Sequence, residues 1–471
     1  MPMKEPEVTM RVLALLTLIV PATGMAMDAM PGEDRFATLL NTKEQTAGAG
    51  LGLSKIDDAY FLQLKPRFSL NLGAIGVGVE LPLNLEVWPR EDNADDLFGL
   101  LRKEDWDDEG EWLKIIRFVR LGNKGSSLFV RYGELAGDIG HGTIVGRYVN
   151  NVDLNNFRAG AQFDVNTKWG GFETLVADVD DLARDTQASK LVALRMYSKP
   201  YAWATGGKDS ILNRLRVGIS WASDINAPLA MGTADPNSAT PNVTQTQKAV
   251  VYGADADLQV FQNALLTLTP YIDYNRTDRG GYGLHIGAMA VAKLPIGLDL
   301  RLPVRLEYRR FSKNYLPAYY GTFYEIERYA YPMGGSGTPL PKWAYLAAQD
   351  GDEGINGLYG EAAFDFLKLV QIGAIYEAYL GQSSNLNVFL NVPALSMLQF
   401  KAYYARINIE GLDDLFVFDE RSAAVAQARY EMIKSIFLVA RASRRWTFDP
   451  AQGSYEPTDE WNFGAEYSLS F

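Results

Sequence analysis

Hydrophobic and polar residues alternate along much of the chain. In residues 298–311, one set of alternate positions is apolar and consists of Leu300, Leu302, Val304, Leu306 and Tyr308. The intervening set carries Arg301, Pro303, Arg305, Glu307 and Arg309. Because successive side chains of a strand point to opposite faces, this segment predicts a strand with one apolar and one charged face. A soluble sheet would turn the apolar face to a core, whereas a membrane barrel would turn it to lipid and the charges to the lumen.

The same alternation recurs in segments about ten residues long, the length that a tilted membrane-spanning strand needs. Clear examples are 214–222, 250–261, 265–275 and 369–380. The apolar faces often end in Tyr or Trp, as the interfacial girdles of membrane barrels do. A β-sandwich would instead show strands nearer five or six residues, with turns about every 8–12 residues.

The connections between these segments differ in length. Short turns are expected at 262–265, 294–297 and 434–435. Longer polar loops are expected at 225–247, 312–355, 411–421 and 449–459. Short turns on one side and long loops on the other are typical of an outer-membrane barrel.

The N-terminal region predicts a secretory signal peptide, residues 1–26. Arg11 supplies a positive charge, residues 12–20 form a short apolar core, and Gly24, Met25 and Ala26 offer small residues near a cleavage position. The apolar run is too short to span a bilayer. A secretory signal peptide begins with a positively charged region, and two glutamates precede Arg11. The true start of the chain is therefore expected at Met10. The mature chain is therefore expected to be exported.

The C-terminal segment 461–471 ends on an aromatic alternation. Phe463, Tyr467, Leu469 and Phe471 share one face of this predicted strand. It resembles the closing strand of bacterial outer-membrane β-barrel proteins of the porin-like kind, without indicating a subfamily. The resemblance implies that a terminal Phe471 on such a strand is read by the barrel assembly machinery. It also implies an outer-membrane location.

Together these patterns predict an all-β fold, a large antiparallel transmembrane β-barrel. We expect about 20 strands, within a range of 16–22, since single bacterial chains favour even numbers. The barrel would occupy residues 46–471, with 46–55 as its first strand and 27–45 as a periplasmic tail or a plug in the lumen.

Composition excludes several kinds of chemistry. The 471 residues include no cysteine and only two histidines, so thiolate metal sites and three-histidine zinc sites are excluded. The formal net charge of -12 makes nucleic acid an improbable partner. No cofactor and no metal are expected.

The inward faces of the predicted strands carry charges of both signs. The expected lumen-lining residues are Arg214, Arg216, Asp255, Asp257, Asp273, His285, Arg301, Arg305, Glu307, Arg309, Glu361, Asp365, Glu377, Arg441 and Arg445. The strand carrying Arg214 and Arg216 should neighbour the strand carrying Asp255 and Asp257. Two roles stay open and are compatible: mutual neutralisation that makes the wall rigid, and a transverse field that selects polar solutes. The mixture of signs indicates neither anion nor cation preference.

Residues 88–112 form a strongly acidic loop. Asp105, Asp107, Glu109 and Gly110 resemble part of a calcium-binding loop, but Ile116 stands where the bidentate glutamate is required. A solvated surface loop is therefore expected.

Residues 137–156 form a glycine-rich loop with an apolar run, which we expect to fold into the barrel and narrow it. Its candidate constriction residues are His141, Thr143, Arg147, Tyr148, Asn150 and Asn151. No nucleophile motif accompanies His141, so catalysis is not expected. His285 is expected to form hydrogen bonds in the lumen.

Residues 314–346 form a long loop rich in aromatic residues. Its candidate contact residues are Tyr319, Tyr320, Phe323, Tyr324, Tyr329, Tyr331 and Trp343. Two roles stay open: an extracellular stacking platform for sugars or other planar ligands, or a lid packed over the barrel mouth.

The function that fits these features best is an outer-membrane channel for passive or gated diffusion of small polar solutes. The alternative is a non-conducting surface scaffold, adhesin or ligand-binding barrel that acts through loops 88–112 and 314–346. Transport of hydrophobic substrates is less compatible with the charged inward faces, and an enzyme is not expected. The expected partners are outer-membrane lipid, the assembly machinery, small polar solutes and, as an open alternative, further copies of the chain.

Overall fold

The structure is a computed structural model of the chain. It describes residues 46–56, 59–88, 100–102, 106, 112, 115–151, 158–184, 188–207, 210–232, 241–294, 300–331, 339–349, 351, 353–366, 369–395, 397–449, 452 and 454–470. The predicted signal peptide, the segment 27–45 and most of the acidic loop 88–112 lie outside the described residues.

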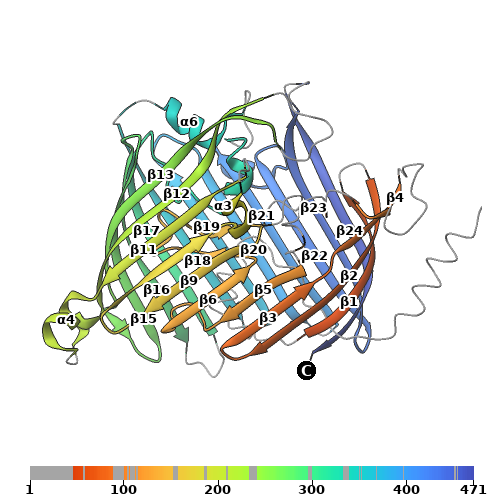
Figure 1. Ribbon diagram of the computed structural model, residues 1–471, viewed down its shortest axis with the longest axis horizontal. Helices are drawn as coiled ribbons and strands as arrows, with labels where there is room; N and C mark the ends of the chain where they lie inside the picture. Colours follow the sequence, from red (N-terminus) through yellow and green to blue (C-terminus); the bar gives the residue numbers. More distant parts are fainter. Residues whose placement is uncertain are drawn as a thin grey trace, which may run out of the picture.

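The described chain is mostly antiparallel β-strand (Figure 1). The strands of the main sheet are β1 (Thr46–Ile56), β2 (Ala59–Leu72), β3 (Ile75–Glu80), β4 (Leu83–Trp88), β5 (Ile116–Leu121), β6 (Leu128–Gly133), β9 (Gly160–Asn166), β10 (Gly170–Val176), β11 (Leu191–Ser198), β12 (Leu215–Met231), β13 (Val243–Leu258), β14 (Phe261–Gln262), β15 (Leu266–Thr277), β16 (Tyr282–Leu294), β17 (Leu300–Ser312), β18 (Gly354–Phe366), β19 (Val370–Tyr379), β20 (Ser384–Leu395), β21 (Leu398–Ile409), β22 (Ser422–Ile433), β23 (Ile436–Asp449) and β24 (Ser454–Ser470). A separate two-stranded sheet joins β7 (Ala136–Gly137) to β8 (Tyr148–Val149).

The main sheet closes on itself, because β1 pairs with β24 as well as with β2. In its described part the sheet has 22 strands. β3 and β4 both pair with β2, and β13 and β14 both pair with β15, so each of these two pairs of strands forms a single element of the wall. The described wall is therefore a closed barrel of 20 antiparallel strands, which confirms the predicted fold class and the strand number. An open sheet would expose the unpaired backbone groups of its two edge strands to lipid. Closure into a barrel pairs these groups.

The alternation of the sequence matches the two faces of this wall. On β17, Leu306 is 63% exposed and Tyr308 is 40% exposed, whereas Arg305, Glu307 and Arg309 are buried. The same division holds on β12, β13, β15 and β19, where Ile219, Tyr252, Ile272, Ile372 and Tyr376 are exposed. A closed barrel with an apolar outer face and polar inner face is the architecture of bacterial outer-membrane β-barrels, in agreement with the predicted location. In the described part of the chain, no helix has the length and apolar character required to cross a membrane.

The longer connections gather at one end of the barrel, which is uppermost in Figure 1, and the C-terminal end of β24 lies at the other. The upper connections include the described residues within 134–159, 177–190, 313–353 and 410–421, which contain α3 (Val179–Ala183), α5 (Tyr324–Glu327), α6 (Lys342–Ala348) and η5 (Leu412–Phe416). Two of the predicted long loops are shorter than expected, since β12 extends to Met231 and β23 extends to Asp449.

One unpredicted helical connection, made of two short elements, lies at the lower end. α4 (Pro200–Thr205) and η4 (Ile211–Arg214) connect β11 to β12 there (Figure 1). Arg214 therefore ends a 3₁₀ turn just before the strand, and the expectation that it lies on a lumen-facing strand is wrong. The turn is favoured by Ser210, whose side chain accepts a hydrogen bond from the backbone of Leu212.

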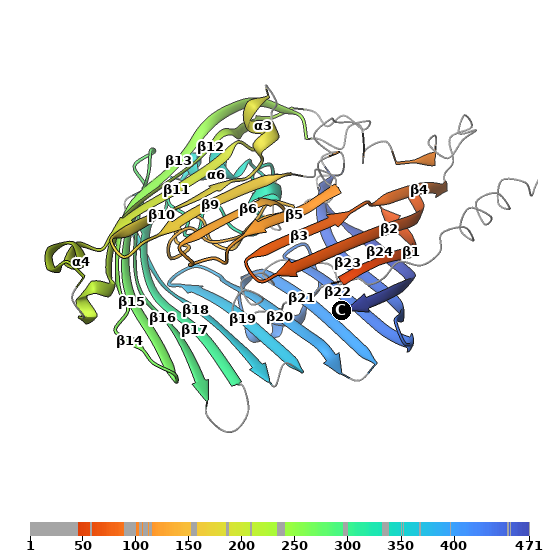
Figure 2. The same ribbon diagram turned by 60° about the horizontal axis from the view of Figure 1, so that its bottom comes forward.

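Two of the upper connections fold inwards (Figure 2). The described residues of 134–151 and 315–346 supply just over half of the large hydrophobic cluster, including Ile144, Val145, Tyr148, Tyr319, Tyr320, Tyr324 and Trp343. Wall residues of β11, β12 and β13, such as Ala193, Ala222 and Val251, complete the cluster. The barrel thus has an internal core beside these strands.

Candidate functional site

The inward loop 134–151 is fixed to the barrel by Asn150. Its side-chain Oδ1 accepts a hydrogen bond of 2.8 Å from the backbone of Leu135, and its Nδ2 donates to the carbonyl of Arg158 at 2.9 Å. The loop also pairs with the other inward connection, through a bridge between Val145 and Tyr320. Asn150 is fully buried and joins both ends of the loop, so it is a structural residue.

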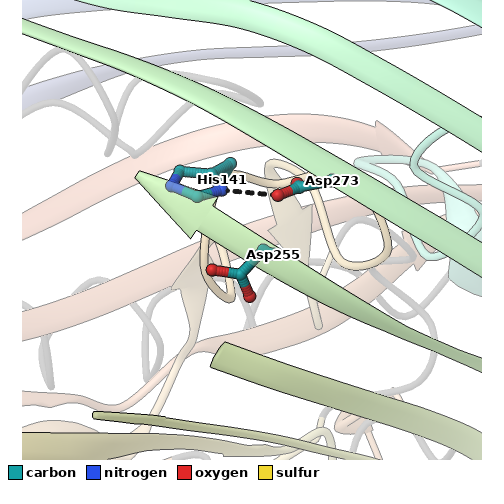
Figure 3. Close-up of side chains that lie close together, drawn as sticks. All are labelled: His141, Asp255 and Asp273. Carbon is teal, nitrogen blue, oxygen red and sulfur yellow. Dashed lines mark hydrogen bonds and ion pairs between the residues drawn. The ribbon is translucent and has the colours of Figure 1, made fainter. Parts of the chain in front are cut away.

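His141, near the tip of this loop, lies between two wall carboxylates. Its Nδ1 is 2.9 Å from Oδ1 of Asp273 on β15, and its Nε2 is 3.1 Å from Oδ2 of Asp257 on β13. The dashed line in Figure 3 marks the contact with Asp273. Its ring stacks on that of Tyr271, with 4.4 Å between the ring centres. Thr143 donates a hydrogen bond of 2.7 Å to the other oxygen of Asp273. The loop is therefore attached to the wall through one buried polar cluster.

These contacts determine the charge of His141. Burial opposes protonation, but the hydrogen bonds and charges of Asp257 and Asp273 outweigh it and raise the pKa of His141 to about 9. The imidazolium form, which can donate from both ring nitrogens, is then the form present at neutral pH. Neither nitrogen is placed to accept a proton from Thr143, because both face carboxylates. This geometry does not fit a histidine general base.

Two arginines balance the remaining carboxylates around His141. Arg195 on β11 donates two hydrogen bonds to Asp255, of 2.5 and 3.0 Å, and one of 3.1 Å to Glu173 on β10. Arg216 on β12 donates to Asp257 at 2.8 Å. The predicted adjacency of the strands that carry Arg216 and Asp257 is confirmed, since these residues are direct partners in the register of β12 and β13.

His141, Asp255 and Asp273 also lie close enough together to be considered as metal ligands, with one possible ligand atom of each within 4.8 Å of the others (Figure 3). The donor atoms are already used, however. Arg195 holds both oxygens of Asp255, and Asp273 is held by His141 and Thr143. A divalent cation would have to displace an arginine and a protonated histidine, so these residues fit an ion-pair cluster better than a metal centre.

A second charged cluster lies around Tyr359 on β18. The guanidinium groups of Arg305 and Arg309 lie over its ring, 4.8 and 4.1 Å from the ring centre. Both arginines also bind Glu307, Arg305 at 2.6 Å. Cation–π contacts of this kind hold arginines in fixed positions without neutralising them.

His285 and Glu377 extend this second cluster. His285 lies 3.0 Å from Glu307 and 3.1 Å from the hydroxyl group of Tyr315. Glu377 accepts a hydrogen bond of 3.3 Å from Arg309 and forms an ion pair of 3.8 Å with Arg147 of the inward loop. Wall and loop are therefore connected here as well, and Arg147 is the residue of the loop that links them.

The aromatic loop does not form an exposed platform. Tyr319, Tyr320, Tyr324 and Trp343 are all at most 1% exposed and pack on one another with ring centres 4.8–5.7 Å apart. Phe323, Tyr329 and Tyr331 are half-buried beside them. The prediction that this loop is an exposed stacking platform is therefore wrong for the four buried rings. They pack together inside the mouth of the barrel, as the alternative prediction had it.

Asp224, which the sequence did not single out, anchors this loop to the wall. It accepts a hydrogen bond of 2.7 Å from the hydroxyl group of Tyr324 and forms an ion pair of 3.1 Å with Arg328. Glu325 of α5 accepts a hydrogen bond of 2.5 Å from Tyr148 of the other inward loop. Asp224 belongs to the inner face of β12, so the alternation could have indicated it, but its partners lie about one hundred positions away in the sequence.

The other predicted lumen residues lie at several places on the wall. Arg305 is the register partner of Glu361, whose side chain accepts a hydrogen bond of 2.8 Å from Tyr359. Arg301 and Asp365 are register partners on β17 and β18. Arg445 forms an ion pair of 3.1 Å with Glu460.

Of the predicted assembly signal, Phe463 is 55% exposed, Tyr467 and Leu469 lie on β24, and Phe471 lies outside the described residues. Of the predicted constriction residues, Asn151 donates a hydrogen bond of 2.8 Å to the carbonyl of Arg158.

The opposite side of the interior contains a hollow. It lies along β1, β2, β22, β23 and β24, and its lining includes Lys65, Arg67, Arg441, Glu460 and Glu466. About 840 Å³ of space outside atoms lies within this lining, part of it continuous with solvent. The interior therefore combines a packed side, which holds both inward loops, with a hollow beside the seam where the barrel closes.

Comparisons with known proteins add little to this geometry. No family model matches the chain, and no curated protein matches it significantly. Among solved structures, Pseudomonas aeruginosa OccK8 (OprE) is 12% identical, with 91% of this chain and 98% of that chain covered and a TM-score of 0.32. The outer membrane protein opdK of the same organism is 9% identical, with 91% and 99% covered and a TM-score of 0.33. The ferric-catecholate import receptor Fiu of E. coli is 9% identical, with 90% and 81% covered and a TM-score of 0.38. The fold assignment rests on the strand pairing of this chain, not on these scores.

Proposed function

We propose that this chain is an outer-membrane channel for the passive or gated diffusion of small polar solutes through a charged lumen. The observation that carries the proposal is the hollow beside the barrel seam, which has charged residues in its lining and lies inside a closed wall whose outer face is apolar. A wall of 20 strands encloses more space than its own side chains fill, so the interior is either open or occupied by loops. Here loops occupy one side, and the hollow remains on the other.

The packed side supplies a means of fixing the width of the path. Loop 134–151 is attached to the wall by His141 and Arg147, and it is attached to the aromatic loop by Tyr148. The contacts of His141 and Tyr148 are buried and all three attachments involve a charged group, so they hold the loop in one position. The bore of the channel is then set by how firmly the loop stays against β13 and β15.

Single-channel recording tests the proposal. The full-length protein, purified from outer membranes of a porin-deficient host, is inserted into a planar bilayer in potassium chloride. Regular current steps that scale with protein concentration are expected. The absence of steps, for protein whose heat-modifiable gel migration shows a folded barrel, would contradict the proposal.

The second candidate function, a non-conducting surface scaffold, is supported by one feature of the described loops. Leu412 and Phe416 of η5 are 85% and 82% exposed, on a loop at the upper end of the barrel. Exposed apolar side chains on a fixed loop are typical of contact surfaces. A folded barrel that gives no current would favour this candidate, with the loop 410–421 as its binding surface in place of the buried aromatic loop.

A further inference from the structure

The loop 410–421 folds over the outer face of the barrel, in contrast to the two loops that fold inwards. On β21, which precedes it, Tyr403 is buried, and its ring centre lies 6.2 Å from that of Phe323 in the inward aromatic loop. Because the side chains of a strand alternate between its two faces, Tyr404 and Arg406 do not share one face with Tyr403 and point away from the lumen instead.

The strand register confirms the outward direction of Arg406. Its partner on β20 is Leu386, which pairs in turn with Tyr376 on β19. Register partners lie on the same face of a sheet, and Tyr376 is 46% exposed on the outer face. Arg406 is nevertheless fully buried, because the loop that follows β21 covers it.

Three contacts attach the loop to this outer face. The hydroxyl group of Tyr404 donates a hydrogen bond of 2.7 Å to the carbonyl of Leu415, and the guanidinium group of Arg406 donates one of 2.7 Å to the carbonyl of Val417. The ring centre of Tyr404 also lies 5.5 Å from that of Phe418. The loop therefore has a fixed position against the outside of the wall.

The charges between the loop and the wall balance one another. Arg406 donates hydrogen bonds of 2.5 Å to Asp414 and Asp419, and Arg421 donates hydrogen bonds of 2.8 and 2.9 Å to the same two carboxylates. Two cations thus face two anions within this contact. Paired and hydrogen-bonded charges can lie beside lipid at a much lower cost than an unpaired charge.

The side of the loop that faces away from this contact is apolar. Leu412, Phe416 and Phe418 are 85%, 82% and 53% exposed. These side chains continue the apolar outer face of β21, to which Phe400 and Tyr404 belong by the strand alternation. Since Tyr is typical of the level at which a barrel wall leaves the hydrocarbon, Tyr404 indicates that the loop lies at the upper boundary of the lipid.

We propose that the loop 410–421 is a membrane anchor, held on the outside of the barrel by Arg406, whose apolar side chains insert between the headgroups and acyl chains of the outer leaflet. The other acids of the loop are Glu410, Asp413 and Glu420, and such charges fit this boundary better than the hydrocarbon interior. The inference goes beyond the proposed channel function and holds whether or not the barrel conducts.

Spin labelling tests the position of the loop. The chain contains no cysteine, so the variants Leu412→Cys and Phe416→Cys each carry a single nitroxide label. The labelled proteins, with folding checked by heat-modifiable gel migration, are reconstituted into phosphatidylcholine vesicles. The measured quantity is the ratio of collision rates with oxygen, which partitions into lipid, and with nickel ethylenediaminediacetate, which stays in water.

Two further labelled variants provide the references. Leu306→Cys reports the outer face in the middle of β17, and Glu353→Cys reports a side chain that is 82% exposed in an upper loop. The ratios at positions 412 and 416 are expected to be several times that of Glu353→Cys and below that of Leu306→Cys. A ratio equal to that of Glu353→Cys would overturn the inference, since the loop would lie in water. Protection from both reagents, with dipolar broadening between labels, would also overturn it, because the loop would then contact a second copy of the chain.

The Arg406→Gln substitution, added to Phe416→Cys, tests the attachment. Loss of the contacts with Asp414 and Asp419 is expected to release the loop and to lower the ratio towards that of Glu353→Cys. Arg444→Gln is the matched control, because Arg444 is an exposed arginine of β23 that pairs with Asp459 at 2.5 Å. It is expected to leave the ratio unchanged. Equal ratios in the two variants would contradict the role assigned to Arg406.

Discussion

The side chain of Asn462 on the last strand donates a hydrogen bond of 2.7 Å to Gln63 on the second strand, across 399 positions of the sequence. The first strand, β1, runs between them. The contact is possible because Gly52 of β1 has no side chain at this level. A Cβ there would lie 3.0 Å from the carbonyl oxygen of Phe463 and 3.4 Å from Nδ2 of Asn462. The seam of the barrel is thus closed by side chains as well as by backbone pairing.

Gly52→Ala is therefore expected to weaken the seam. The added methyl group meets backbone atoms that cannot rotate away, and such crowding costs about 1–3 kcal/mol of the free energy of unfolding. Urea unfolding in detergent micelles measures the change. Gly360→Ala is the matched control, because a Cβ at that strand position meets only Leu306, at an ordinary distance of 3.6 Å. Equal losses in the two variants would show that the seam has no special requirement for glycine.

His141→Gln is expected to release the inward loop from the wall. The substitution removes the cation that lies between Asp257 and Asp273, and it leaves two buried carboxylates without that charge. The single-channel current is expected to become larger or to fluctuate between levels, as recorded in a planar bilayer. Lys313→Gln, which removes an exposed cation at the start of the long loop 313–353, serves as the control. Unchanged current steps in the His141→Gln variant would show that this loop does not limit the path.

The stability of the wild-type barrel should fall between pH 6.5 and about 9. The pKa of His141 is raised from 6.5 to about 9 in the folded state, so folding takes up a proton in this range. The associated stabilisation, about 3 kcal/mol, is complete below pH 6.5 and is lost as the pH rises through 9. The free energy of unfolding, measured by urea at intervals of pH, tests this. The difference between wild type and His141→Gln isolates the histidine from other titrating groups, and a difference independent of pH would contradict the assignment.

Leu306→Arg is expected to destabilise the barrel by about 2–4 kcal/mol, because the side chain lies on the outer face in the middle of β17 and is 63% exposed there. Phe261→Arg offers the comparison. This residue is similarly exposed, at 51%, but it lies at the lower end of its strand, where a charge should cost about 0–1 kcal/mol. Unfolding from lipid vesicles measures both. A larger loss for Phe261→Arg would mean that the outer belt is positioned differently.

Arg406 is expected to hold the loop 410–421 in place. It is fully buried and donates hydrogen bonds of 2.5 Å to both Asp414 and Asp419. Burial would raise the pKa of Asp419, but its hydrogen bonds with Arg406 and Arg421 lower it to about 2. Arg406→Gln should make this loop sensitive to added protease while the barrel stays folded. Arg421→Gln should have a smaller effect, because that side chain is 22% exposed. Resistance of both variants to cleavage would show that other contacts fix the loop.

Several features of this protein follow from the sequence alone. The alternation in 298–311 identifies both the strand and its lipid face, because the direction of a strand side chain depends only on its position along the strand. The adjacency of Arg216 and Asp257 also follows from the chain order, since neighbouring segments joined by one connection pair in an antiparallel barrel. The first strand at 46–55 follows from the requirement for an even number of strands. These are local properties, and each can be inferred within one hairpin or from one count.

The contents of the barrel were decided by the tertiary structure. Nothing near His141 in the sequence indicates that it lies between Asp257 and Asp273, and Arg195, which supplies the counter-charge, was missed although it lies on an inner face. The aromatic loop 314–346 gave no sign of whether its rings would be exposed or buried. The seam hollow depends on strands at opposite ends of the chain. The physical reason is the same in each case: a long loop packs into whatever space the closed wall leaves, and that space exists only after distant segments have paired.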